Sequence, residues 1–239
     1  MFVLVGFETL AGTFLLMWVT MLVWRVVDRG HYRAATYCLI PLVGALSFAL
    51  PRSLRLEGFI LTGLLAAFLI AVYSQRPTLE IAAGALASAV SIWLLVRAGS
   101  QGCGGCTDGI ALSMIGAFFL GAVTHAMVLG HWYLNQPRLP IEPLKGATRI
   151  MIASVGFVIV AGVATRGRLV KAILPGIVSF SASGYWWAWV LLIVGTGVLA
   201  FMVRATVWAK STQSATGLLY IAMLTAIGAH FILSLLVAP

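Results

Sequence analysis

The sequence predicts an all-α fold, a polytopic bundle of about eight transmembrane helices. Of its 239 residues, 62% are hydrophobic and only 9% are charged, whereas about 25% of the residues of a soluble domain are charged. Runs that lack charged residues recur along the whole chain, and a run of about 20 apolar residues spans a bilayer. No segment is polar enough to form a soluble domain, so residues 1–239 are expected to form a single integral membrane domain.

Eight apolar runs give the expected spans. They are 2–24, 35–51, 57–74, 79–97, 110–133, 147–166, 184–207 and 212–237. The first run carries Glu8 and lacks a clear small-residue cleavage site, so we expect a retained helix rather than a signal peptide. The second run is short, and Pro41 within it predicts a kink or a break.

A segment of mixed character follows the sixth run. Residues 167–174 place Arg168 and Lys171 among leucine, isoleucine and valine, and the pair Pro175-Gly176 comes next. This pattern favours a short amphipathic helix that lies at the membrane interface over a ninth span.

The basic residues predict the orientation of the bundle, because lysine and arginine favour the cytoplasmic side. With both termini outside, nine basic residues lie inside and six outside. The inner set is Arg25, Arg29, Arg33, Arg76, Arg138, Lys145, Arg149, Arg204 and Lys210, and the outer set is Arg52, Arg55, Arg97, Arg166, Arg168 and Lys171. We therefore expect a multi-pass protein of a plasma membrane of the bacterial inner type, with its termini outside. The net charge of +9 lies on short loops, where it meets anionic headgroups of the lipid bilayer and needs no nucleic acid.

Three of the four histidines, His125, His131 and His230, lie within spans or at their edges. Ionisable groups inside a membrane are costly and indicate function. Imidazole can ligate haem b or donate a hydrogen bond to a quinone, so these histidines are candidate ligands of either cofactor. Hydrogen bonding between helices, a proton relay and a metal role are the alternatives for His125. His31, in the first basic loop, is expected to be a solvated surface residue.

Helix geometry limits how these histidines can combine. Six residues separate His125 from His131, which corresponds to about 120° around the helix and about 9 Å along it. The two therefore face different neighbours and cannot hold one small metal ion. His125 and His230 are expected at levels roughly 10 Å apart, which argues against a simple pair of ligands on one haem.

An aromatic and basic cluster follows at the end of the fifth span. His131, Trp132, Tyr133 and Arg138 combine a hydrogen-bonding imidazole with flat apolar walls at the depth of a lipid-soluble headgroup. They are a candidate quinone site, and an interfacial aromatic girdle is the alternative.

Glu8 is the second intramembrane ionisable feature. A carboxyl group there must be protonated, paired or close to the surface, because an isolated charge in lipid costs several kcal/mol. Glu8 either reaches the headgroups or pairs with a histidine of another helix, which makes it a candidate for a proton relay.

Cys103 and Cys106 form a CxxC motif in the loop "GSQGCGGCTDG". Covalent haem attachment requires histidine after the second cysteine, where Thr107 stands, and a four-thiolate site lacks ligands because Cys38 is the only other cysteine. The two intervening glycines permit the tight turn of a small ring, and Asp108 disfavours a thiolate. The motif predicts a closed, unreactive disulfide on the outer face, and a metal half-site completed by another chain is the alternative.

These features favour an integral membrane subunit of a redox or energy-converting complex, active in electron transport and surrounded by other membrane subunits. The sequence has no Walker lysine loop and no dinucleotide fingerprint. Two alternatives stay open. One is a non-catalytic scaffold or anchor subunit, whose histidines link helices. The other is a small solute or proton-coupled carrier, with Glu8 and His125 as its proton pair.

Overall fold

The computed structural model describes residues 2–101, 107–136, 138–165 and 182–237, which form eight α-helices and no strand. The helices are α1 (Phe2–Val23), α2 (Arg29–Ala49), α3 (Arg52–Ser74), α4 (Pro77–Gln101), α5 (Thr107–Asn135), α6 (Glu142–Thr165), α7 (Ala182–Trp208) and α8 (Thr212–Val237). All eight are long and apolar enough to cross a membrane. The predicted all-α bundle of eight helices is therefore confirmed for the described residues.

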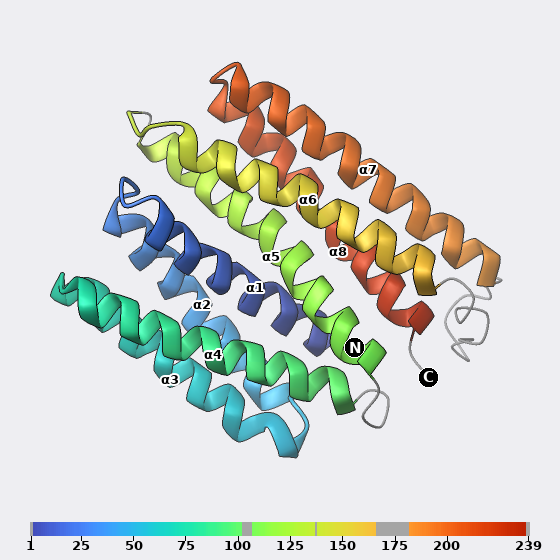
Figure 1. Cartoon of the computed structure of the whole chain (residues 1–239), viewed down its shortest axis with the longest axis horizontal. Coiled ribbons are helices and arrows are strands. Elements are labelled where there is room, and N and C mark those ends of the chain that lie inside the picture. Colours follow the sequence, from blue (N-terminus) through green and yellow to red (C-terminus); the bar gives the residue numbers. More distant parts are fainter. Residues whose placement is uncertain (1, 102–106, 137, 166–181, 238–239) are drawn as a thin grey trace.

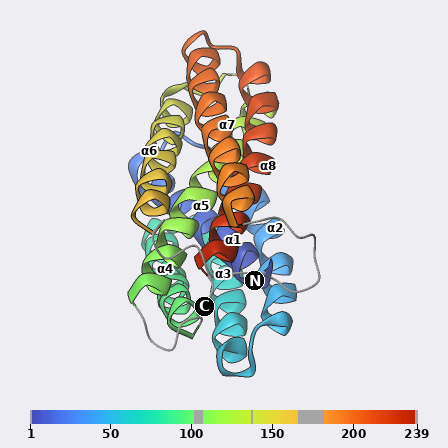
Figure 2. The same ribbon diagram turned by 90° about the vertical axis from the view of Figure 1, so that its right-hand side faces the viewer.

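The helices lie side by side along one direction, and α3 and α4 are at the opposite edge of the bundle from α7 (Figure 1). Both termini lie at the same end, called the terminal end here. The opposite end, called the basic end, carries the connections between α1 and α2, α3 and α4, α5 and α6, and α7 and α8. The view turned by 90° shows the same set of long helices (Figure 2).

Helix α5 is the central element, because it packs against α1, α4, α6 and α8. Its backbone meets that of α1 where Gly12 faces Gly121. A Cβ added to Gly12 would lie 1.8 Å from the Ala117 carbonyl oxygen, and one added to Gly121 would lie 2.3 Å from the Gly12 carbonyl carbon. Small residues let two helices approach this closely where lipid supplies no hydrophobic drive.

Helix α2 differs most from the sequence prediction, since it begins at Arg29 rather than near residue 35. The Asp28 carboxylate caps it by accepting a hydrogen bond from the Gly30 amide. The helix also continues through Pro41, so of the two alternatives for Pro41 a break is wrong. Proline removes one backbone hydrogen bond, and the helix nevertheless continues to Ala49.

Two predictions lie outside the described residues. They are the interfacial helix near residues 167–174, with Arg168 and Lys171, and the disulfide between Cys103 and Cys106.

Candidate functional site

A cavity of about 730 Å³ lies at the basic end, between the α1–α2 connection and the start of α4. Its apolar walls include Met21, Leu22 and Ile81. Its polar wall includes Arg25, Arg29, Arg33, Tyr32 and Glu80. The cavity therefore combines apolar surface with hydrogen-bond donors, as the site of an amphiphilic ligand does.

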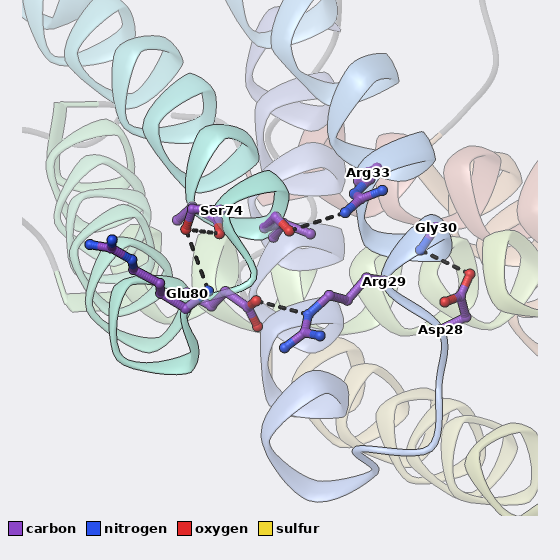
Figure 3. Close-up of polar contacts among 9 residues, drawn as sticks. Asp28, Arg29, Gly30, Arg33, Ser74 and Glu80 are labelled. Carbon is purple, nitrogen blue, oxygen red and sulfur yellow. Dashed lines mark hydrogen bonds and ion pairs between the residues drawn. The ribbon is translucent and has the colours of Figure 1, made fainter.

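Most charges around the cavity are matched by a partner from another segment. Arg29 Nε lies 2.9 Å from Glu80 Oε1 (Figure 3), and the Glu80 side chain is only 7% exposed. Arg33 donates to the Val72 carbonyl at 3.4 Å, and its guanidinium lies 4.3 Å from the centre of the Tyr73 ring. These contacts join α2 to α3 and α4 and hold the polar wall in place.

Tyr32 is the least satisfied polar group of the cavity wall. Its side chain is 2% exposed, and its hydroxyl has no hydrogen-bond partner among the described residues. A buried hydroxyl without a partner costs about 1–3 kcal/mol. A ligand with an acceptor atom at this position would remove that cost.

His31 lies beside Tyr32 and is buried, so the prediction of a solvated surface histidine is wrong. The reason is the early start of α2, which places residue 31 in a helical turn packed against α5 instead of in a loop. His31 Nε2 has no partner among the described residues. The sequence signal that residue 31 lies in a helix is Asp28, a good N-cap residue three positions before the histidine.

His31 belongs to a cluster of rings from α2 and α5, called the histidine cluster here. The centre of its ring lies 5.3 Å from that of Tyr32, 5.7 Å from that of Trp132 and 6.4 Å from that of His125. Trp132 Nε1 is also buried without a partner among the described residues. His125 Nε2 lies 2.8 Å from Thr20 Oγ1, which connects the cluster to α1.

The structure does not gather His131, Trp132, Tyr133 and Arg138 into one site. His131 is exposed and its Nδ1 lies 3.3 Å from the Tyr220 hydroxyl on α8, whereas Trp132 faces His31 on α2. The buried Tyr133 hydroxyl donates to the Pro140 carbonyl, and Arg138 is exposed. Successive residues of a helix point about 100° apart, which explains why neighbours in sequence separate here.

His125, His131 and His230 also do not converge. His230 contacts Glu8, and His125 contacts Thr20. Twelve residues separate Glu8 from Thr20 on α1, which is about 18 Å along the helix. No single haem iron can therefore be ligated by His125 and His230, and the separation is larger than the roughly 10 Å expected from the sequence.

Glu8 pairs with His230 across the interface of α1 and α8, at 2.6 Å between Oε2 and Nε2. The Glu8 side chain is 2% exposed and that of His230 is 0% exposed. Of the two alternatives for Glu8, the structure shows the pairing with a histidine of another helix. The Glu8–His125 pair of the carrier alternative is wrong, because His125 contacts Thr20, which lies about 18 Å from Glu8 along α1.

Metal ligands and known relatives add no further assignment. Within the described parts of the chain, no three histidine, cysteine or acidic side chains form a group that could hold a metal ion. No protein-family model, no curated protein and no solved structure matches the chain. The function is therefore inferred from the chain's own residues.

Proposed function

We propose that this chain is an integral membrane protein that binds the ring headgroup of a quinone in the cavity at the basic end. It would act as a membrane subunit of a redox or energy-converting complex. The observation that carries the proposal is Tyr32, a residue of the cavity wall whose buried hydroxyl has no hydrogen-bond partner among the described residues.

A quinone matches the two kinds of surface in this cavity. Its carbonyl oxygens accept hydrogen bonds, and Tyr32 offers a donor that no described protein group uses. Its apolar tail fits the wall of Met21, Leu22 and Ile81, and Ile81 is 39% exposed. The tail can therefore leave the cavity toward lipid.

The charges of the wall also favour a neutral headgroup. Arg29 is paired with Glu80 at 2.9 Å. Five charged side chains on the wall, namely Arg25, Asp28, Arg29, Arg33 and Glu80, give a net charge of only +1. A phosphate-bearing lipid headgroup is the competing ligand, and the experiment below distinguishes it.

The protein residues bind and orient the headgroup in this proposal. Tyr32 donates to one carbonyl, and the Arg29–Glu80 pair holds the polar walls of α2 and α4 together. When bound, a quinone supplies two-electron redox chemistry, with electrons from a partner subunit. Haem b is not proposed, because His125, His131 and His230 do not share one site.

The proposed orientation places the basic end inside a bacterial inner-type membrane and both termini outside. Its support is the larger number of basic residues in and beside the connections of the basic end, nine against six by sequence. Reporter fusions at the two termini test this orientation. A reporter that is active only in the cytoplasm should be inactive at both.

Titration of the protein in lipid nanodiscs with a short-chain quinone analogue tests the proposed ligand, with tryptophan quenching as the signal. We expect saturable binding, weakened about tenfold in Tyr32→Phe because one hydrogen bond is lost. Tyr220→Phe, which alters the contact with His131, is the matched control and should bind normally. Equal affinity in wild type and Tyr32→Phe would contradict the proposal. Displacement of the analogue by an anionic phospholipid but not by a second quinone would assign the cavity to a lipid headgroup.

A non-catalytic scaffold subunit is the second candidate. The hydrogen bond between Thr20 and His125 favours it, since this bond links α1 to α5. His125→Ala should then lower the stability of the bundle and leave the activity of a parent complex unchanged.

A further inference from the structure

Glu8 and His230 join the first and last helices of the bundle. Their side-chain atoms Oε2 and Nε2 are 2.6 Å apart, and both residues are buried. Helix α1 packs mainly against α5, whereas α8 packs mainly against α7 and then against α5, and α1 and α8 contact each other little. This polar contact is therefore a principal connection between α1 and α8.

The space for the pair comes from Gly116 on α5. A Cβ at this position would lie 2.2 Å from His230 Cε1 and 3.0 Å from Glu8 Oε2. Any larger residue would displace the imidazole ring. The hydroxyl of Ser234, one turn away on α8, lies 3.4 Å from His230 Nε2. The fold thus leaves room for an acid and a base between three helices.

Other ionisable groups lie far from the pair along the helices that carry it. Asp108 and His125 are eight and nine residues from Gly116 on α5, or about 12 and 14 Å along the axis. Tyr220 is ten residues from His230 on α8, or about 15 Å. On the other helices packed against α1 and α8, the ionisable side chains are Arg29, His31, Tyr32, Arg33, Tyr37 and Cys38 on α2, Glu80 and Arg97 on α4, and Tyr185 and Arg204 on α7.

The number of protons on the pair decides its net charge. Without an added proton, an ionised Glu8 beside a neutral imidazole leaves a buried negative charge. With one proton the pair is neutral, and with two it is positive. A buried charge without a counter-charge is strongly unfavourable, so the neutral form is the stable one.

The geometry identifies where this proton can reside. If His230 Nε2 donates to the Glu8 carboxylate, the second ring nitrogen, Nδ1, takes up the proton. Nδ1 is buried and has no hydrogen-bond partner among the described residues. Transfer of the shared proton to Glu8 Oε2 gives a neutral acid beside a neutral imidazole and the same total charge.

We propose that Glu8 and His230 form a proton-binding site that takes up one proton, becomes neutral and so clamps α1 to α8. The site is separate from the quinone cavity, because the backbone contact of Gly12 and Gly121 closes the α1–α5 interface between them. It is also independent of the proposed quinone function, since the two involve different residues and different measurements.

Nitrogen NMR of histidine-labelled protein in nanodiscs, combined with infrared spectroscopy of carboxyl groups, tests the site at about pH 8, where an isolated imidazole is neutral. We expect one held proton in the wild type. It appears as protonation of both His230 ring nitrogens or as a protonated carboxyl band that Glu8→Gln removes. Glu57→Gln is the matched control and should change neither signal.

Substituting each member of the pair should change the protonation of the other member in a different way. Glu8→Gln removes the counter-charge, so His230 should become a neutral ring. His230→Gln leaves the buried carboxyl without a partner, so a protonated carboxyl band should appear and should vanish in the double variant. A neutral His230 ring beside an ionised Glu8 in the wild type would overturn the proposal. Persistence of a charged His230 ring in Glu8→Gln would also overturn it.

Discussion

Substitution of Gly12 by alanine tests the close contact of α1 with α5, on which the placement of both candidate sites depends. The added Cβ would lie 1.8 Å from the Ala117 carbonyl oxygen, whereas real Cβ atoms essentially never approach closer than 3.0 Å. The two backbones must therefore separate locally by about 1.2 Å. Neither is the far end of a flexible side chain, so no rotamer change relieves the clash.

The energetic consequence follows from two opposing effects. Overpacking of a well-packed interface costs about 1–3 kcal/mol, whereas alanine gains up to about 1 kcal/mol over glycine within a helix. We expect Gly12→Ala to lower the free energy of unfolding by about 1–2 kcal/mol. Thermal unfolding of the purified protein in detergent, followed by circular dichroism, measures the difference.

Gly63 on α3 provides the matched control, because a Cβ added there meets nothing within 4 Å. Gly63→Ala should be as stable as the wild type or more stable, since only the helix-propensity gain applies. If Gly12→Ala is as stable as Gly63→Ala, α1 and α5 do not meet through their backbones. The separation of the two sites would then lose its structural basis.

Three further predictions concern two polar contacts and the cysteines. Thr20→Val removes the hydroxyl that bonds the buried imidazole of His125 on α5. It should lower the free energy of unfolding by about 1–3 kcal/mol. Thr62→Val, whose hydroxyl donates to the Gly58 carbonyl of its own helix, should cost less in the same assay. Glu80→Gln breaks the ion pair that joins α4 to α2 and should lower both thermal stability and affinity for the quinone analogue. Cys38 is a free thiol, so the denatured chain should label at one cysteine without reductant and at three after reduction if the predicted disulfide within 103–106 is closed.

The eight helices could be predicted from the sequence because a long apolar run has few alternatives to a buried or membrane-spanning helix. The residues at which helices begin and end were harder to predict from the sequence. The start of α2 at Arg29 falls within a basic stretch, and hydropathy describes such residues as loop. The N-cap residue Asp28 carries the signal that hydropathy lacks.

The partners of the polar side chains could be predicted only in part. The sequence indicated that Glu8 could pair with a histidine of another helix, but it did not indicate His230, because apolar runs do not reveal which helices are neighbours. It also missed His31 and Tyr32 in the site at the basic end. Their burial follows from the contact of α2 with α5, a tertiary feature that no local pattern encodes.

Photolabelling with a quinone that carries a photoactivatable ring tests the proposed site most directly. In nanodiscs containing the full chain, labelling followed by peptide mass spectrometry should locate the adducts in residues 21–33 and 75–81, around the cavity. An excess of unmodified quinone should suppress them, and Tyr32→Phe should reduce them. Adducts concentrated in residues 131–138 instead, or adducts that unmodified quinone does not suppress, would contradict the account.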